Sequence, residues 1–534
     1  MILVRVGRST LAALRPPPFR SIRSTKLRNH GVYSHRSFSS SSTMAAESTS
    51  PTPVNALGSL TSELDKLAPR FELRPSQLTV LNSPDAFYST LKERILQAKE
   101  RVFLSTLYIG KAEHELIDTI GNALRINPNL KVSVLTDALR GTREEPKATT
   151  ASLLVSLVKE FGEERVDIRL FHTPNLKGLK KKIVPRRLNE GYGLQHMKLY
   201  GFDDEIMLSG ANLSEDYFTN RQDRYHIFSS KEITDYYYSI HKAVSSLSFR
   251  ALPADTPSQF ALDWPSTNPA PSPIDHPHKY KQAATKILGD LLKPKFSPKP
   301  IDTKEEATYL YPVSQFTPIV DKTDPSTELP AIKTVLSALF TPGLRPASWT
   351  FTAGYFNIHS SISELLRKSA EVVHQGTIIT ASPEANGFLG SKGMSGYLPA
   401  GYTMLSLRFL RALKDKGSSI QLREWRNGVV NTPGGWSYHA KGIWVAAGGA
   451  AGQSLPLLTV IGSSNYTRRS YGLDIECGAI VVSNQDQVRS AWRAELDNLL
   501  KHTNAVTAKD LEREERGVND WKMRLLLWLF EKRL

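Results

Sequence analysis

Cysteine is almost absent from this chain of 534 residues, which contains only Cys477. A single cysteine excludes an internal disulfide framework and any zinc site built from cysteines. A run of the ~20 apolar residues that a membrane-spanning helix requires is also missing, since the apolar run at 525–530 is far too short. Hydrophobic residues make up 40% and charged residues 22% of the chain, which is ordinary for a globular protein. The length indicates at least two domains.

Acidic residues are absent from positions 1–46, although this stretch holds eight arginines and lysines and a serine cluster at 39–42. An arginine-rich, serine-rich segment without acids is typical of a mitochondrial transit peptide. We therefore expect residues 1–45 to be a disordered transit peptide, with a disordered basic tail as the alternative. These eight charges are half of the net charge of +16, and the remaining charge, about +8, favours anionic partners without requiring nucleic acid.

The same alternation of helix and strand patterns occurs twice in the chain. The first copy begins with a helix predicted from Ser83, a good N-cap before Pro84, with Phe87, Leu91 and Ile95 on one face. Its further elements are strands at 102–108, 131–136 and 166–171 and a helix at 153–160. The second copy has helices around 332–339 and 362–367 and strands at 349–356, 377–381 and 420–425. This alternation predicts a duplicated α/β protein with parallel strands and helices packed on each sheet.

Prolines crowd the stretch between the two copies, which is predicted to be a connector with one helix near 280–292. The predicted organisation is a linker at 46–69, a first domain at 70–250, a Pro-rich connector at 251–325, a second domain at 326–505 and a C-terminal amphipathic helix at 506–534. The C-terminal segment combines aromatic and basic residues, which suits a helix lying at a membrane surface. A helix docked on the protein's own core is the alternative.

Each copy carries a histidine, a lysine, an asparagine and an acid in the same order. The first copy has His196, Lys198, Asp203, Asn212 and Asp223, and the second has His439, Lys441, Ser463, Asn465 and Glu476. In both copies the acid follows the asparagine by eleven positions, from 212 to 223 and from 465 to 476. The histidine precedes the asparagine by 16 positions in the first copy and by 26 in the second. One H-x-K sequence is weak evidence, but two copies with matched companions are much stronger.

These residue types suit phosphodiester chemistry that needs no metal ion. Residues i and i+2 of a strand share a face, so a pseudo-twofold pairing of the halves would bring both histidines and both lysines around one point. The lysines and the side chains of Asn212, Asn465 and Ser463 would then orient and neutralise phosphate oxygens. One imidazole would attack phosphorus while the other protonates the departing oxygen. Asp223 and Glu476 would each fix the tautomer of an imidazole and raise its basicity.

The first copy resembles the H-x-K-x4-D motif of the phospholipase D superfamily, with His196, Lys198 and Asp203 in its three places. The second copy matches the histidine and the lysine, but Ala446 stands where the aspartate should be. The resemblance implies two phospholipase D-like α-β-α domains related by pseudo-twofold symmetry, with the active site between them. The missing aspartate weakens any requirement for this carboxylate in both copies.

Two strings of the second copy, 437–444 and 460–469, resemble the eukaryotic CDP-diacylglycerol–glycerol-3-phosphate 3-phosphatidyltransferases, the mitochondrial phosphatidylglycerophosphate synthases. This resemblance implies CDP-diacylglycerol and glycerol 3-phosphate as substrates, no cofactor, no metal ion and no nucleic-acid partner. It also implies a peripheral place on the mitochondrial inner membrane and its anionic surface. His196 would be the nucleophile that forms a phosphatidyl-histidine, and His439 the general acid and base. Lys198, Asp203 and Lys441 would complete the catalytic set.

Other interpretations of the same residues stay open at this point. The site would equally serve a mitochondrial nuclease or tyrosyl-DNA phosphodiesterase, or a phosphatidylserine synthase that differs in its acceptor. A catalytically inactive lipid-binding scaffold is the alternative from another class. The basic run at 177–187 and the pair Arg468 and Arg469 are candidates for binding anionic headgroups or a second phosphate, or are solvated surface charges.

Overall fold

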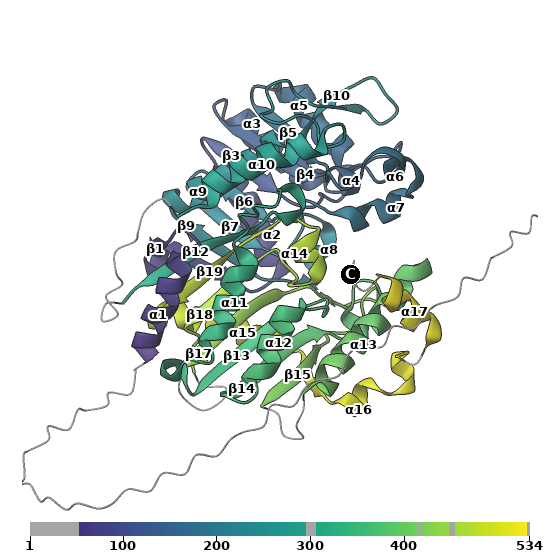
Figure 1. Ribbon diagram of the computed structural model, residues 1–534. Coiled ribbons are helices and arrows are strands. Elements are labelled where there is room, and N and C mark those ends of the chain that lie inside the picture. The colour runs from purple at the N-terminus through teal and green to yellow at the C-terminus, as the bar shows by residue number, and fades with distance from the viewer. Residues whose placement is uncertain (1–52, 295–305, 414–418, 448–453, 519, 531–534) are drawn as a thin grey trace, which may run out of the picture. The chain divides into compact units, whose positions relative to one another are not determined.

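The computed structural model describes residues 53–294, 306–413, 419–447, 454–518 and 520–530. The transit peptide predicted at 1–45 lies outside these residues. The described chain forms two mixed β-sheets of nine strands each, together with a short two-stranded sheet (Figure 1). The first copy of the sequence pattern supplies most of one large sheet and the second copy most of the other. The predicted duplicated α/β fold is therefore confirmed.

Six strands of each large sheet follow the same order, although the edge strands differ. The first sheet contains, from edge to edge, β11 (Phe260–Asp263), β10 (Phe249–Pro253), β5 (Val166–Phe171), β4 (Lys131–Asp137), β3 (Arg101–Ser105), β6 (Leu199–Phe202), β7 (Glu205–Ser209), β9 (Tyr225–Ser229) and β2 (Leu78–Leu81). The second contains β1 (Phe71–Leu73), β12 (Thr308–Gln315), β19 (Glu476–Ser483), β18 (Leu458–Gly462), β17 (Lys441–Ala447), β13 (Ala347–Ala353), β14 (Val373–Ala381), β15 (Ile420–Trp425) and β20 (Thr503–Val506). The common order is β5-β4-β3-β6-β7-β9 in the first sheet and β15-β14-β13-β17-β18-β19 in the second. In each, three adjacent parallel strands are followed by an antiparallel hairpin and a further antiparallel strand.

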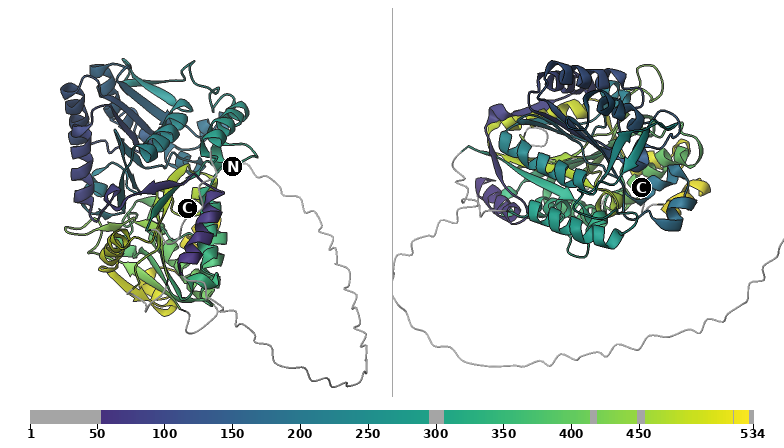
Figure 2. Two further views of the ribbon diagram at one scale, coloured as in Figure 1. Left: turned by 90° about the vertical axis from the view of Figure 1, so that its left-hand side faces the viewer. Right: turned by 90° about the horizontal axis from the view of Figure 1, so that it is seen from above.

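Helices lie on the sheets, and the views in Figure 2 show strands between layers of helices. The helices of the first half are α2 (Pro84–Gln97), α3 (His114–Ile126), α4 (Ala138–Gly141), α5 (Thr150–Phe161), α6 (Gly178–Ile183), α7 (Arg186–Asn189), α8 (Glu215–Thr219), α9 (Lys231–Ser246) and α10 (Pro277–Leu292). The others are α1 (Pro53–Asp65), α11 (Glu328–Ala338), α12 (Ser360–Ser369), α13 (Leu398–Arg411), α14 (Arg468–Gly472), α15 (Asp486–Leu500), α16 (Ala508–Leu511) and α17 (Trp521–Phe530).

Local sequence signals account for the start of α2. The Ser83 side chain accepts a hydrogen bond from the Ala86 backbone at 3.2 Å, and Pro84 occupies the first helical position. Phe87, Leu91 and Ile95 are fully buried, as their spacing on one helical face predicts. The cap at Ser83 and the apolar face therefore both favour a helix that begins at Pro84.

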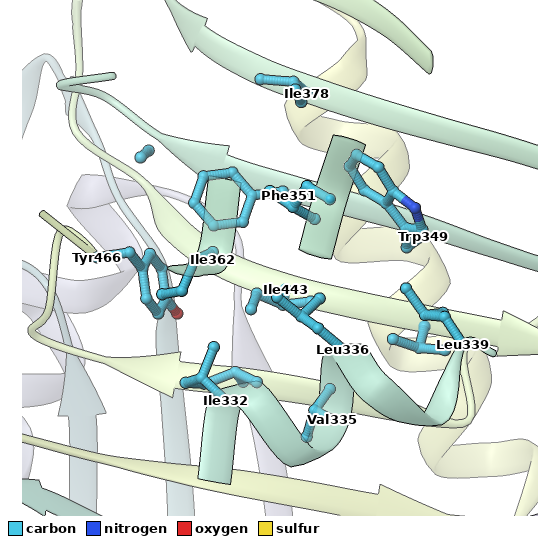
Figure 3. Packing of buried hydrophobic residues seen from close by; sticks show 14 of the residues in the cluster. Ile332, Val335, Leu336, Leu339, Trp349, Phe351, Ile362, Ile378, Ile443 and Tyr466 are labelled. Atoms are coloured by element: carbon cyan, nitrogen blue, oxygen red, sulfur yellow. The ribbon is translucent and has the colours of Figure 1, made fainter. Parts of the chain in front are cut away.

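The core of the second half shows the same logic (Figure 3). Ile332, Val335 and Leu336 of α11 pack on Phe351 of β13 and Ile443 of β17. All five side chains are essentially inaccessible to solvent. A second core lies on the outer face of the first sheet, and a third is shared between the two sheets. This shared core joins the halves into one structure.

The stretch 251–325, expected to be a connector, contributes strands to both sheets. The hairpin of β10 and β11 extends the first sheet beyond β5, and β12 pairs with β19 in the second. The sequence does not predict β12 because the strand contains Pro312, and proline is unusual inside a sheet. It is tolerated because β1 pairs only with the residues 308–310 of β12, so Pro312 faces no partner strand on that side. The division into domains at 70–250 and 326–505 stays a prediction.

Both ends of the described chain also join the second sheet. Part of the expected linker 46–69 forms α1, whose Leu57, Leu60 and Leu64 enter the core of the second half, and β1 pairs with β12. The expected C-terminal helix is shorter than 506–534, because β20 and α16 precede α17. Leu57, Leu60 and Leu64 have a helical apolar spacing, which the serine-rich and threonine-rich surroundings obscured.

A buried ion pair fastens the two halves to each other. Arg224 donates through Nε and Nη2 to the Glu495 carboxylate of α15 at 2.8 and 2.9 Å, and these side chains are 0% and 3% exposed. The Arg224 guanidinium also donates to the Val460 carbonyl at 2.6 Å and lies 3.9 Å from the ring centre of Trp444. Burial would raise the pKa of Glu495, but Arg224 and His226 lower it to about 2. The pair is therefore charged at every physiological pH.

Replacing Glu495 by glutamine is expected to destabilise the protein by about 3–5 kcal/mol, because the Arg224 charge would remain buried without its partner. The measurement is the midpoint of urea unfolding of the purified protein. Asp497→Asn on the same helix is the matched control, since its ion pair with Arg493 is solvent-exposed and worth less than about 1 kcal/mol. Equal shifts in the two variants would contradict this role for the buried pair.

Candidate active site

The two predicted His–Lys pairs meet where the halves join. His196 and Lys198 lie immediately before β6, and His439 lies two residues before Lys441, the first residue of β17. The backbone N–H of His196 donates to the Ile475 carbonyl of the other half at 2.9 Å. The N–H of His439 donates equally to the Gln222 carbonyl at 2.9 Å. These two bonds relate the halves by the predicted pseudo-twofold symmetry.

The predicted acids each contact the histidine of the opposite half. Glu476 follows Ile475, and its carboxylate lies 2.9 Å from Nδ1 of His196. Asp223 follows Gln222, and its carboxylate lies 2.7 Å from Nδ1 of His439. The backbone bond to the preceding carbonyl thus delivers each acid to its imidazole. With Nδ1 of each ring facing an acid, Nε2 is the nitrogen that can meet a substrate; Nε2 of His439 also lies 3.4 Å from the Tyr217 hydroxyl.

Both lysines are buried beside the imidazoles. Lys198 Nζ donates to the His196 carbonyl at 2.7 Å, and Lys441 Nζ lies 2.6 Å from Nδ1 of His439 and 3.2 Å from Asp223 Oδ2. A Cβ at Gly210 would collide with Lys441 and Asp223, which explains the glycine before Asn212. Burial lowers the pKa of Lys198 to about 7 despite the nearby Glu476, so a bound phosphate would draw a proton onto this lysine.

The two asparagines keep free acceptor atoms in the site. Nδ2 of Asn212 donates to the Tyr217 hydroxyl at 3.1 Å, whereas its Oδ1 finds no partner in the described part of the chain. Oδ1 of Asn465 is likewise unpartnered among the described residues. Unpaired buried polar atoms are costly unless a ligand satisfies them. Ser463, expected to bind phosphate, instead donates to Glu476 Oε2 at 2.5 Å.

The two His–carboxylate pairs differ in their charge. Burial raises the pKa of Glu476 to about 7, although Lys198 and Ser463 oppose this shift. Burial acts on Asp223 too, but Lys441 and His439 outweigh it and hold the pKa of Asp223 below its ordinary value. Burial, followed by the neighbouring lysines, lowers the pKa of both histidines well below 6.5. At neutral pH His439 therefore faces a fully ionised acid, whereas His196 faces one that is partly protonated.

Asp203, the third residue of the first motif, is not brought to this site. It occupies the β6–β7 turn with φ of 48°, and its carboxylate accepts hydrogen bonds from the backbone N–H groups of Lys99, Glu100 and Arg101 at 2.8–3.0 Å. The expected catalytic role is therefore contradicted by its position, and a structural role replaces it. Ala446, which stands in the corresponding place of the second copy, lies on β17 opposite Ser348.

Two tyrosines beside His439 were not anticipated. The Tyr217 hydroxyl lies 3.4 Å from Nε2 of His439, and the Tyr355 ring packs edge-on against the imidazole at 5.7 Å. Tyr217 lies five positions after Asn212 on α8, so its closeness to the motif was a usable signal. No sequence signal pointed to Tyr355, because only the folding of the second half brings it to His439. Among the described residues, no three His, Cys, Asp or Glu side chains are grouped to hold a metal ion.

Similar proteins place the chain in a family. No protein-family model matches it. The "CDP-diacylglycerol--glycerol-3-phosphate 3-phosphatidyltransferase" of Saccharomyces cerevisiae is 47% identical over 88% of this chain and 91% of its own length. The protein of that name from Schizosaccharomyces pombe is 38% identical over 86% of this chain and 95% of its own. The human relative, whose name adds "mitochondrial", is 34% identical over 85% of this chain and 83% of its own.

Solved structures identify the fold. The crystal structure of phosphatidylserine synthase from Haemophilus influenzae matches with a TM-score of 0.65 at 20% identity, over 88% of this chain and 96% of that one. The two halves have the fold of this phosphatidylserine synthase, and the named relatives are phosphatidyltransferases. The chain belongs to the family of CDP-diacylglycerol–glycerol-3-phosphate 3-phosphatidyltransferases.

The position of Asp203 gives a direct test of its role. Asp203→Asn is expected to lower stability by roughly 1.5–3 kcal/mol, because a charged acceptor of three backbone hydrogen bonds is lost, and to leave turnover unchanged. Asp223→Asn is expected to lower turnover by roughly 10²–10⁴-fold, because it acts through His439. The measurements are the thermal midpoint and kcat for CMP release. Loss of turnover in a stably folded Asp203→Asn protein would contradict the structural role.

Proposed function

We propose that the protein transfers the phosphatidyl group of CDP-diacylglycerol to sn-glycerol 3-phosphate, giving phosphatidylglycerophosphate and CMP. The observation that carries this proposal is the pair of buried histidines, each bonded at Nδ1 to an acid of the other half. Two such imidazoles supply one nucleophile and one proton carrier, which a double displacement at phosphorus requires. The names of relatives at 34–47% identity support the substrates.

The reaction proceeds in two steps with a phosphatidyl-histidine between them. Nε2 of His196 attacks the phosphatidyl phosphorus, a P–N bond forms, and the bond to the bridging oxygen of CMP breaks as His439 gives that oxygen a proton. The C1 hydroxyl of glycerol 3-phosphate then gives its proton to His439 and attacks the same phosphorus. The P–N bond breaks, and His196 returns to its neutral form.

The charges of the acids favour this assignment of the two histidines. Asp223 is ionised and stabilises the protonated form of His439, as a residue that carries a proton needs. Glu476 has a pKa of about 7 and stabilises a protonated His196 less, so that His196 stays neutral and nucleophilic. Lys198, Lys441 and the Nδ2 groups of Asn212 and Asn465 would donate to the phosphodiester oxygens that gain charge during the attack.

Membrane contact would come from two exposed elements. On α17, Met523 and Leu527 are fully buried, while Trp521 and Trp528 are 68% and 78% exposed. On α6, Leu179 and Ile183 are 71% and 67% exposed and flank lysines 180–182. Figure 1 and the view from above in Figure 2 place both elements on the same side of the described chain. Exposed aromatic and aliphatic side chains among cations suit an anionic lipid surface.

The sequence allowed the C-terminal helix either to dock on the protein's own core or to lie at a membrane surface. Both apply here, because one face of α17 is docked and the other is exposed for contact with lipid. None of the helices in the described ranges is long and apolar enough to cross a bilayer. The proposed location is the mitochondrial inner membrane, with peripheral attachment, and mammalian relatives bear the word "mitochondrial" in their names. The product would lead towards phosphatidylglycerol and cardiolipin.

The reaction is tested by CMP release from CDP-diacylglycerol in mixed micelles, with glycerol 3-phosphate, serine or water as the acceptor. Release that depends on glycerol 3-phosphate is expected, and His196→Ala and His439→Ala should each lower it by at least about 10³-fold. Acid quenching of the wild type with labelled lipid should trap an acid-labile phosphoryl-histidine that His196→Ala lacks. Labelling of His196→Ala but not of His439→Ala would reverse the two roles, and release with serine alone would change the acceptor.

The membrane surface is tested by flotation with vesicles rich in anionic phospholipid. The Trp521→Ala/Trp528→Ala variant is expected to bind roughly 10–100-fold more weakly, since each indole contributes about 1 kcal/mol or more when it enters the interface. Ile126→Ala, which removes an equally exposed apolar side chain (72%) from α3, is the matched control and should bind normally. Unchanged binding of the double variant would refute the role of α17.

A further inference from the structure

We infer that Arg221 binds the phosphate of the acceptor and thereby selects glycerol 3-phosphate over uncharged alcohols. This inference rests on the proposed function, because it concerns the same site. A phosphatidyl transfer to this acceptor involves two phosphate groups. The lysines and asparagines around the histidines would bind the phosphodiester, so a further cation is needed for the phosphomonoester at the other end of the acceptor.

The second phosphate must lie on the His439 side of the site. In a double displacement the acceptor takes the place that CMP has left, opposite the nucleophile and next to the group that accepts its proton. With His196 as the nucleophile, the acceptor hydroxyl lies at His439. Its phosphate is three carbons away, a span of about 6 Å from ordinary bond lengths, so the cation must lie near His439 but not touch it.

Arg221 has this position. It is the first residue of β8 (Arg221–Gln222), which pairs in parallel with β16 (Ser437–Tyr438) just before His439. Its Nε donates to Ser437 Oγ at 2.9 Å. Its guanidinium lies 4.6 Å from the centre of the Tyr217 ring, whose hydroxyl is 3.4 Å from Nε2 of His439. One tyrosine ring therefore separates the guanidinium from the imidazole.

The guanidinium is also available to a ligand. Its carboxylate partner is Asp216, which meets Nη2 at 2.9 Å and is 59% exposed, against 14% for the Arg221 side chain. An ion pair with so exposed an acid contributes little, so an incoming phosphate can displace the carboxylate. Nη1 makes no hydrogen bond within the described residues. A Cβ at Gly387 would come within 3.2 Å of Nη2 and 3.4 Å of the Tyr355 hydroxyl, so the glycine leaves room beside both groups.

Two other arginines near the histidines, Arg469 and Arg224, are already occupied. Arg469, which the sequence suggested for a second phosphate, donates to the Asp474 carboxylate at 2.8 Å and to the Glu190 carbonyl at 2.8 Å. Its partner Asp474 is only 6% exposed and cannot turn away into solvent. Arg224 is bound by the buried Glu495. Of these three cations, Arg221 alone has an exposed acid as its partner.

The test compares acceptors in the steady state with purified full-length protein. Arg221→Met is expected to raise KM for glycerol 3-phosphate roughly 10–100-fold, the factor for a lost charged hydrogen bond, and to leave KM for CDP-diacylglycerol unchanged. Transfer to glycerol, which lacks the phosphate, should be as slow as in the wild type and no slower. Equal losses with both acceptors, or a changed KM for CDP-diacylglycerol, would overturn the inference.

A second variant covers the case in which Arg221→Met folds poorly. Asp216→Asn removes the competing carboxylate and should lower KM for glycerol 3-phosphate by up to about 5-fold, the factor for a surface ion pair, which a bracing role of Arg221 would not produce. An unchanged or higher KM would contradict the subsite. Tighter inhibition by CMP without a change in KM for glycerol 3-phosphate would assign Arg221 to the leaving group instead and refute the acceptor role. A wild type that releases no CMP with any acceptor would refute the proposed reaction itself.

Discussion

Two backbone hydrogen bonds across the pseudo-twofold axis determine the geometry of the whole site. The N–H groups of His196 and His439 donate to the carbonyls of Ile475 and Gln222, and the next residue along each partner chain is the acid that meets the imidazole. Neither half alone contains a complete His–acid pair. The fold must therefore hold the halves in one register, which the shared core and the buried pair of Arg224 and Glu495 ensure. A slip at this junction would separate both acids from their histidines at once.

The duplicated site is symmetric in its backbone and asymmetric in its side chains. Asp223 shares its charge with Lys441, whereas the equivalent Glu476 accepts from Ser463, which stands where the first half has Gly210. This single exchange of glycine for serine changes the hydrogen-bonding partner of the acid. The acids then differ in charge at neutral pH, and the two imidazoles acquire different tendencies to hold a proton. A duplicated motif can divide nucleophile and proton carrier in this way while its fold stays the same.

Much of the fold and part of the site could be predicted from the sequence. Alternation along a strand places His196 and Lys198 on one face, and the equal spacing from asparagine to acid indicated that Asp223 and Glu476 belong to the site. The crosswise pairing of acids and histidines could not be predicted, because it depends on the junction between halves. The distance of Asp203 from the site could have been predicted, because five residues of extended strand place it roughly 16 Å from Lys198. The strand β12 was not predicted because it contains Pro312, and proline is unusual inside a sheet; the structure tolerates it because Pro312 has a partner strand, β19, on one side only.

Burial of the site explains how it can act on phosphorus with its own residues. The lysines and acids are taken out of water together, so their charges largely cancel and the desolvation cost stays bearable. The same burial lowers the pKa of both histidines and brings the pKa of Lys198 to about 7. A phosphodiester that enters brings negative charge into this low-dielectric space and stabilises the protonated lysine. Binding of a phosphodiester would therefore stabilise the protonated form of Lys198 and increase the positive charge of the site.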